Sequence, residues 1–288
     1  MSEVLIGCSG WSYGDKAEKG GWVGSFYPNT TTKRLPYYSQ YFNTVEIDAT
    51  YYDKFYKYMT QDTFKKLAEA TPDNFQFSTK VPETITREKK LGEGSLELFN
   101  EFLDKTAPLR KAGKLGAILF QMSPNFTVDD FKNAEIFLDR LPRDYDYALE
   151  FRHASWQTEG APELLKHYNI ASVMTDSPDP KLKFLAEPIV TADHAFIRFH
   201  GRNEGFWYNY LYIKKELEPW AEKVKITKDL KIKKLRIYFN NHYGGKAVLN
   251  ALQFKEMLGE KLSKEQLDAR QRAETHLTGK DNLQQWFQ

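Results

Sequence analysis

Short runs of β-branched and aromatic residues alternate along the chain with longer segments whose apolar residues recur at helical spacing. Such runs are typical of strands, and the segments between them, for example SLELFNEFLDKTAPLRKAG and VDDFKNAEIFLDRL, are typical of amphipathic helices. The expected strands begin at Val4, Thr44, Phe75, Gly116, Tyr147, Ala171, Ala195 and Lys234. Eight strand–helix units predict a closed parallel (β/α)8 barrel of the TIM type. An open doubly wound sheet is the alternative, but GCSGWSYG lacks the glycine fingerprint that such a fold places after its first strand.

The predicted barrel has one irregular connection and one extension. Residues 177–194 are rich in proline and show no helical stripe, so the helix after strand six is expected to be missing or replaced by a loop. Residues 263–288 are expected to form a helical extension on the outside. No linker or internal repeat interrupts the chain, so residues 1–288 are predicted to form a single barrel domain.

Composition and charge narrow the classes of partner. The chain has 41 Lys and Arg residues and 39 Asp and Glu residues, which leaves a net charge of +2. Composition therefore gives no argument for nonspecific nucleic-acid binding, although local basic clusters could still bind a nucleic acid. No run approaches the roughly 18 apolar residues of a membrane span, and MSEVLIG does not resemble a signal peptide. The only cysteine is Cys8, which excludes an intrachain disulfide. These features predict a cytoplasmic protein without a membrane partner.

Side-chain alternation assigns an unusually charged set of residues to the barrel interior. Successive side chains of a strand face opposite sides, so placing the apolar residues against the helices sends the others inward. The inward set comprises Glu46, Asp48, Gln76, Ser78, Lys80, Gln121, Glu150, Arg152, Asp176, Arg198, His200, Arg236, Tyr238 and Asn240. Most of these residues lie near the carboxyl ends of their strands, where barrel enzymes bind substrates, so they predict a site at that mouth. The alternative is a purely structural network of paired charges.

The acidic residues suggest hydrolysis, and metal binding is less favoured. A glycosidase needs two carboxylates about 5 to 9.5 Å apart. Glu46 and Glu150 belong to strands two and five and are expected to lie well apart, so Glu150 with Asp176 of the adjacent strand is the better pair. The interior lysine and arginines would repel a divalent ion, and no HExxH motif is present. We therefore predict neither a metal nor a cofactor.

An anion site is predicted where strands seven and eight end. In FNNHYGGKAVLNA, Gly244 and Gly245 stand between strand eight and a helix, where free backbone N–H groups and the positive helix end would face the mouth. Strand seven ends in RFHGR and brings Arg198, His200 and Gly201 beside this turn. A phosphate often binds at this place in barrels. Close packing at the start of a helix is the alternative role of the two glycines.

Aromatic residues gather in the loops that follow the strands. The first loop, GCSGWSYGDKAEKGGWVGSFYP, contains Trp11, and the loop after strand five contains Trp156. Aromatic rings at the mouth could stack on a sugar or a base. They could equally pack as a lid beneath the following helix.

Taken in order, several motifs resemble the YecE-like family, numbered 72 among the domains of unknown function. The resemblance runs through IGCSGWSY, FYP, YYSQYFNTVEIDATYY, TPDNFQFSTKVPETIT, KLGAILFQMSP, LEFRHASW, RFHGR and FNNHYGGKAVLNA, and covers the chain to about Leu258. It implies a TIM-like barrel and no established activity. The family motifs fall on Glu46, Lys80, Glu150, Arg152, His153, Trp156, Arg198, His200, Gly201, Asn240 and Asn241. Members commonly have EINSTFY where this chain has EIDATYY, so the resemblance does not require Asp48 to be ionised. They often have a histidine where this chain has Arg87, so no general base is assigned there.

Together these patterns predict an enzyme, a hydrolase or isomerase, that acts on a small anionic substrate such as a phosphorylated sugar or a nucleotide-like compound. The expected catalytic residues are Glu46, Lys80, Glu150, Asp176 and His200. The expected substrate-binding residues are Trp11, Arg152, His153, Trp156, Arg198, Gly201, Asn240, Asn241, Gly244 and Gly245. Glu150 or Glu46 would serve as general base, and His200 or Lys80 as acid. A metal-dependent nucleic-acid hydrolase and a noncatalytic ligand-binding barrel remain alternatives.

Overall fold

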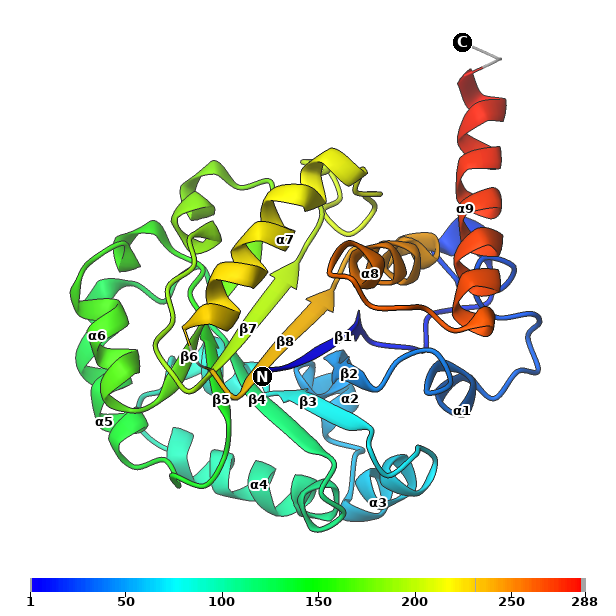
Figure 1. Ribbon diagram of the computed structural model, residues 1–288. Coiled ribbons are helices and arrows are strands. Elements are labelled where there is room, and N and C mark those ends of the chain that lie inside the picture. Colours follow the sequence, from blue (N-terminus) through cyan, green and yellow to red (C-terminus); the bar gives the residue numbers. More distant parts are fainter. Residues whose placement is uncertain (1, 231, 286–288) are drawn as a thin grey trace.

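The computed structural model describes residues 2–230 and 232–285, in which eight parallel strands close into a barrel (Figure 1). Each strand pairs with its neighbours in the sequence, and β8 closes the barrel on β1. The strands are β1 (Glu3–Ser9), β2 (Thr44–Ile47), β3 (Gln76–Lys80), β4 (Leu115–Gln121), β5 (Tyr147–Glu150), β6 (Ile170–Asp176), β7 (His194–Phe199) and β8 (Lys234–Phe239). Each begins within one residue of its expected start. The predicted TIM-like fold is confirmed.

Helices surround the barrel, and α9 stands to one side of it against α8 (Figure 1). They are α1 (Arg34–Tyr38), α2 (Asp53–Tyr56), α3 (Gln61–Glu69), α4 (Ser95–Lys111), α5 (Phe131–Asp139), α6 (Gly160–His167), α7 (Lys214–Asp229), α8 (Lys246–Met257) and α9 (Lys264–Gln285). In α4, Phe99, Phe102 and Leu109 are buried at helical spacing, as the pattern predicted. Within the described ranges, no helix has both the length and the apolar character needed to cross a bilayer.

The connection from β6 to β7 is irregular, as expected. Residues 177–193 are all described, and they contain no α-helix but a 3-10 helix, η6 (Pro180–Ala186). Asp179 accepts a hydrogen bond from the backbone N–H of Lys181, and Pro180 occupies the first turn, so the helix begins with ordinary helix-start signals. Pro188, soon after its end, has no N–H with which to continue it.

The barrel interior is divided into an apolar layer and a polar layer. Ala117, Leu119, Val173 and Phe196 pack around Tyr238 in the apolar layer. The Tyr238 hydroxyl lies 2.7 Å from Thr44 Oγ1 and 2.8 Å from Ser78 Oγ, where it forms the floor of the polar layer. The polar layer therefore opens toward the carboxyl ends of the strands.

Arg236 departs from this division, because it lies at the amino end of the barrel. Its side chain faces inward, as predicted, but its guanidinium donates to Asp146 Oδ2 at 2.8 Å, and Asp146 immediately precedes β5. Arg236 is consequently remote from the charged residues at the mouth.

Candidate functional site at the barrel mouth

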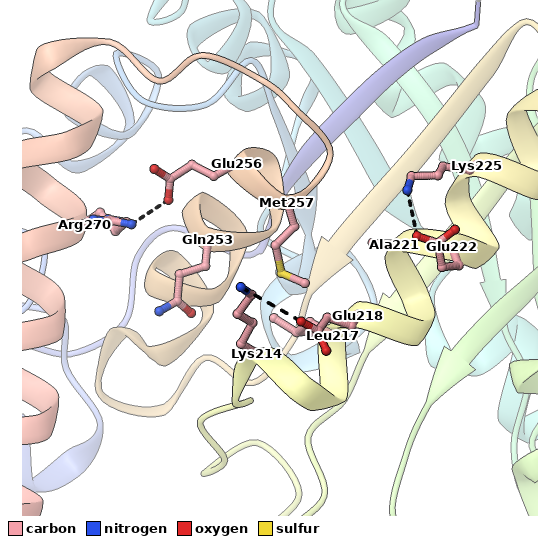
Figure 2. A pocket seen from close by; sticks show the side chains of 10 residues that line it. All are labelled: Lys214, Leu217, Glu218, Ala221, Glu222, Lys225, Gln253, Glu256, Met257 and Arg270. Atoms are coloured by element: carbon pink, nitrogen blue, oxygen red, sulfur yellow. Dashed lines mark hydrogen bonds and ion pairs between the residues drawn. The ribbon is translucent and has the colours of Figure 1, made fainter.

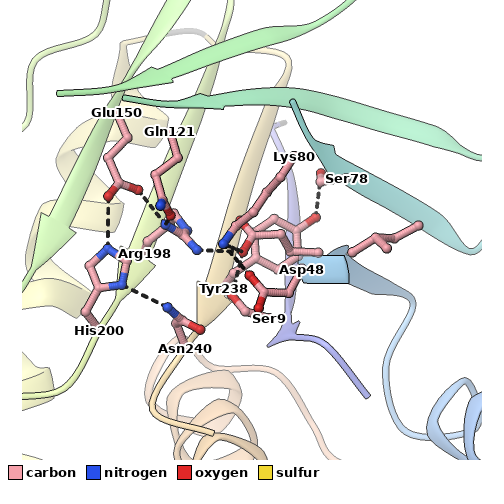
Figure 3. A network of polar contacts seen from close by, with 12 residues as sticks. Ser9, Asp48, Ser78, Lys80, Gln121, Glu150, Arg198, His200, Tyr238 and Asn240 are labelled. Atoms are coloured by element: carbon pink, nitrogen blue, oxygen red, sulfur yellow. Dashed lines mark hydrogen bonds and ion pairs between the residues drawn. The ribbon is translucent and has the colours of Figure 1, made fainter. Parts of the chain in front are cut away.

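Arg198 of β7 is the centre of a buried polar network at the mouth (Figure 3). Its Nη1 donates to Glu150 Oε2 at 2.6 Å and to Gln121 Oε1 at 2.8 Å, and its Nη2 donates to Glu46 Oε1 at 2.7 Å. All three charged side chains are fully buried. Burial by itself would lower the pKa of Arg198, but the two carboxylates raise it, so the guanidinium stays charged. Arg198 thus joins β2, β5 and β7 through the centre of the barrel.

Lys80 of β3 lies beside Asp48, the first residue after β2 (Figure 3). It also connects Asp48 to Glu46. Its ammonium contacts Asp48 Oδ1 and lies 3.7 Å from Glu46 Oε1. Burial alone would raise the pKa of Asp48, but the ammonium beside it brings that pKa below its ordinary value. Lys80 is 4% exposed and Asp48 is 26% exposed, so this pair forms the edge of the network nearest to solvent.

Glu150 of β5 accepts from three donors. Besides Arg198, these are Arg152, through its Nε, and His200, whose Nε2 lies 3.2 Å from Glu150 Oε1. Burial would raise the pKa of Glu150, yet Arg152 and Arg198 hold it well below its usual range. Both oxygens of Glu150 are therefore occupied by donors, and its carboxylate is ionised at neutral pH.

His200 is a neutral histidine in a defined tautomer. Burial lowers its pKa to about 3, despite the neighbouring Glu150. Asn240 Nδ2 lies 3.0 Å from His200 Nδ1, and the Glu150 carboxylate can only accept, so both contacts are hydrogen bonds in the tautomer that has its proton on Nε2. Arg152 Nη2, 3.3 Å from the same Nε2, is a donor and makes no hydrogen bond to the ring in that tautomer. The structure brings Asn240 into the network in this way, through His200.

The charges of the network balance, and one carboxylate oxygen is left over. Glu46, Asp48 and Glu150 face Lys80, Arg152 and Arg198. Glu46 Oε1 accepts from Ser9 Oγ and from Arg198, both at 2.7 Å. Glu46 Oε2 is buried and has no hydrogen-bond partner among the described residues. Buried polar atoms are normally paired, so this oxygen is an exception within the network.

A cavity of about 360 Å³ lies beside the network. Its lining includes Trp11, Tyr13, Asp48, Tyr52 and Phe55. Trp11 therefore stands near the charged residues, as the sequence suggested. The cavity combines aromatic walls with one carboxylate, which suits a molecule that has both apolar faces and hydroxyl groups.

The loop between β7 and α7 contributes aromatic residues that were missing from the expected site. The ring of Trp207 lies 5.7 Å from the guanidinium of Arg152 and 6.3 Å from the ring of His200. Tyr208 stacks on His242, whose other neighbour in the stack is Tyr13. The run FWYNYLY in this loop was the available signal, because so many aromatic residues are uncommon in an exposed connection.

The prediction that the glycine turn offers free backbone N–H groups to an anion is wrong. The N–H of Gly244 donates to Gly20 O at 3.0 Å, and the N–H of Gly245 donates to His242 O at 3.1 Å, so neither is free. Both glycines have positive φ, and a Cβ on Gly245 would lie 2.5 Å from Ser25 Oγ. The alternative role in close packing accounts for this turn.

Gly201 also has a structural role. Its φ is 90°, a Cβ there would lie 1.9 Å from Trp207 O, and its N–H donates to the Tyr212 hydroxyl at 2.8 Å. Asn241 is similarly engaged, because its Nδ2 donates to Tyr210 O and Asn250 Oδ1, both at 2.8 Å. Both residues hold the loop after β7 near the mouth.

The inward orientation expected for Asp176 is wrong. Its carboxylate accepts from Trp220 Nε1 of α7 at 2.7 Å and from Arg202 Nη2 at 2.6 Å, and Tyr212 OH lies 3.3 Å away. These partners lie outside the strands, where Asp176 joins the end of β6 to α7 and its preceding loop. It therefore forms no acid pair with Glu150.

Trp156 and His153 also lie outside the polar network. Trp156 is 1% exposed, stacks on Phe126 and Phe151, and donates from Nε1 to Phe126 O at 2.9 Å. His153 Nδ1 accepts from the backbone N–H of Ser155 at 3.1 Å and so caps the short helix η5 (Ala154–Trp156). Trp156 packs in the core between the barrel and its helices and takes no part in the polar network.

A second hollow, of about 750 Å³, lies between α7, α8 and α9 (Figure 2). Its charged side chains pair with one another, as in Glu256 with Arg270 at 2.6 Å and Glu222 with Lys225 at 2.7 Å. These pairs are exposed or half-buried, and ion pairs of this kind contribute little to stability. The mouth network is the better candidate site.

Residues 5–275 match the family described as protein of unknown function DUF72. UPF0759 protein YunF of Bacillus subtilis is 29% identical over 284 residues, which cover 88% of this chain and 94% of YunF. UPF0759 protein YecE of Escherichia coli K12 is 25% identical over 191 residues, which cover 59% of this chain and 68% of YecE. The crystal structure of a DUF72 family protein from Thermotoga maritima is 32% identical, with a TM-score of 0.75, over 90% of this chain and 100% of that chain.

Proposed function

The chain belongs to the DUF72 family of proteins of unknown function, and we propose that its barrel mouth is the active site of a hydrolase or isomerase for a small anionic substrate. The substrate class is a phosphorylated sugar or a nucleotide-like compound. The observation that carries the proposal is the unpartnered, buried Glu46 Oε2 within a network whose charges otherwise balance. Buried polar atoms normally have a partner, and a bound substrate would supply the one that this oxygen lacks.

Glu46 is the general base in this proposal, in preference to Glu150. Both oxygens of Glu150 already accept hydrogen bonds from charged or neutral donors, and its pKa is far below neutrality, which makes it a weak base. Glu46 keeps one oxygen for a substrate proton. Glu150 acts as a positioning residue that orients Arg152 and His200.

Lys80 is the general acid or electrostatic stabiliser. Its ammonium lies between Glu46 and Asp48, so it connects the base to the cavity that Asp48 lines. A cation there would stabilise negative charge that develops on a substrate oxygen. His200 is neutral, with its pKa at about 3, so it is no proton donor of comparable strength at neutral pH. Asp48 holds Lys80 in place, a task that an asparagine oxygen could also perform.

Arg152 is the anion-binding residue, in place of Arg198. Arg198 is fully buried and its two terminal nitrogens are bonded to Glu46, Glu150 and Gln121. Arg152 is 12% exposed, and Trp207 lies over its guanidinium. An arginine in this position can present a planar edge to a phosphate or carboxylate.

Thermal denaturation of the full chain in the presence of ligands tests the anion site. The panel contains inorganic phosphate, sulfate, sugar phosphates and nucleotides, with a chelator throughout. A ligand at about one hundred times its Kd stabilises by roughly 2.7 kcal/mol, which is readily measured. We expect one phosphorylated class to raise the Tm, and Arg152→Gln to remove the rise. Arg87→Gln is the matched control, because Arg87 is exposed and loses the same charge. A rise unchanged in Arg152→Gln would refute this site.

Turnover is tested with the stabilising compound itself. We expect the wild-type chain to convert it, as followed by phosphorus NMR, and Glu46→Gln to retain binding while losing conversion. Binding by the wild type without any conversion would instead indicate a noncatalytic ligand-binding barrel. Conversion by Glu46→Gln at the wild-type rate would remove Glu46 from the mechanism.

A further inference from the structure

A second group of polar residues lies at the amino end of the barrel, opposite the mouth. Asp146 immediately precedes β5, Asp193 immediately precedes β7, and His194 is the first residue of β7. One ligand atom from each of the three side chains lies within 4.8 Å of the other two. The cluster therefore brings together two loops that enter the barrel on either side of β6.

His194 is unusual within this cluster because it is buried without a hydrogen bond. It is 1% exposed, and neither Nδ1 nor Nε2 has a partner in the parts of the chain that the structure describes. Buried imidazoles are normally hydrogen-bonded, since losing water without a replacement costs free energy. A bound ion would supply the missing contact.

We propose that Asp146, Asp193 and His194 bind one divalent transition-metal ion. Zinc accepts both imidazole nitrogen and carboxylate oxygen ligands, and in open sites three protein ligands leave a further position to water. Calcium and magnesium prefer oxygen ligands alone, so the imidazole disfavours them.

Neighbouring residues hold the two carboxylates in orientation. Asn169 Nδ2 donates to Asp193 Oδ1 at 3.2 Å, and Lys233 donates to Asp193 Oδ2 at 2.6 Å. Arg236 donates to Asp146 Oδ2 at 2.8 Å. Such contacts from outside the ligand set orient metal-binding carboxylates, although the positive charges of Lys233 and Arg236 oppose the ion. The site is accordingly expected to bind zinc less tightly than an uncompensated acidic site would.

The ion would have a structural role that is independent of chemistry at the mouth. It would tie the loop before β5 to the loop before β7, two segments separated in the sheet by β6. Active sites of TIM barrels lie at the carboxyl ends of the strands, whereas the amino ends serve stability. Binding is therefore expected to raise the Tm and to leave ligand binding by Arg152 unchanged.

Cobalt and zinc titrations of the chelator-treated full chain test the site. We expect one Zn²⁺ per chain by equilibrium dialysis, and visible d–d absorption from one bound Co²⁺ that Zn²⁺ displaces. His194→Gln is expected to abolish the absorption. Asp193→Asn, which preserves side-chain shape, is expected to weaken zinc binding by more than about tenfold. His167→Gln is the matched control, because His167 lies at the end of α6 beside Tyr168, and it should bind like the wild type.

A further variant addresses the opposing charge. Lys233 is exposed, so Lys233→Met should fold normally, and it should lower the Kd for zinc by removing a competitor for Asp193. Absence of Co²⁺ absorption in the wild type would overturn the proposal. So would binding of equal strength in the wild type and Asp193→Asn, a comparison that stands even if His194→Gln fails to fold.

Discussion

Replacing Glu150 by glutamine is expected to lower the free energy of unfolding by about 3 kcal/mol. Glu150 is fully buried and accepts from Arg198 Nη1 at 2.6 Å, from Arg152 and from His200 Nε2 at 3.2 Å. Removal of one partner from a buried ion pair costs about 3–5 kcal/mol, because the other charge remains buried. Glutamine keeps one acceptor oxygen, and Arg198 keeps Glu46 and Gln121, so the lower end of this range is expected.

Urea denaturation at pH 7, followed by tryptophan fluorescence and far-UV circular dichroism, measures this loss. The m-value should stay constant while the midpoint falls, because the surface exposed on unfolding is unchanged. Asp62→Asn is the matched control: Asp62 also loses one charge beside a cation, Lys66 at 2.7 Å, but on the exposed surface of α3. The control midpoint should not change measurably. A loss below about 1 kcal/mol for Glu150→Gln would refute the role assigned to the buried network.

Three further outcomes are expected. The unfolded chain binds a proton at His200 below about pH 6.5, whereas the folded chain does so only near about pH 3. The free energy of unfolding should therefore fall as the pH drops from about 6.5 to about 3. His200→Gln should make the free energy of unfolding less dependent on pH between about pH 6 and 5. Trp156→Ala should destabilise by about 3–5 kcal/mol in urea denaturation without changing the affinity for a mouth ligand, because Trp156 packs in the core. Gly201→Ala should destabilise by more than about 1 kcal/mol, whereas Gly205→Ala, whose Cβ would have no neighbour closer than 3.6 Å, should leave the Tm unchanged. An unchanged pH dependence in His200→Gln would contradict the first argument. Weaker ligand binding by Trp156→Ala would contradict the second, and equal Tm values for Gly201→Ala and Gly205→Ala would contradict the third.

The barrel, its irregular connection and most of the residues that face inward could be predicted from the sequence. Strands have a local signature, and alternation depends only on the geometry of the extended chain. The strands around Glu46 in β2 and Arg198 in β7 have one apolar and one polar face. The side chains that face inward could therefore be predicted there without any tertiary information. The resemblance to a family of unknown function agreed with that fold.

Asp176 shows where this reasoning stops. In IASVMTD both faces of β6 are apolar: Val173 packs inside the barrel and Met174 packs outside. Alternation alone had no basis for choosing the inner face for Asp176. Trp220, whose indole N–H donates to the Asp176 carboxylate, lies on α7, so the choice depended on a contact between distant segments.

Which polar groups have hydrogen-bond partners likewise depends on contacts between distant segments. The N–H of Gly244 is used by Gly20 O, more than two hundred residues earlier in the chain, and Arg198 is used by acids from β2 and β5. Within the described ranges, Glu46 Oε2 and the His194 ring are left without hydrogen-bond partners, because neighbours from other strands determine which polar atoms are paired. Local sequence specifies backbone pattern and side-chain orientation, but hydrogen-bond satisfaction is a property of the closed barrel, because its donors and acceptors come from segments that only the fold brings together.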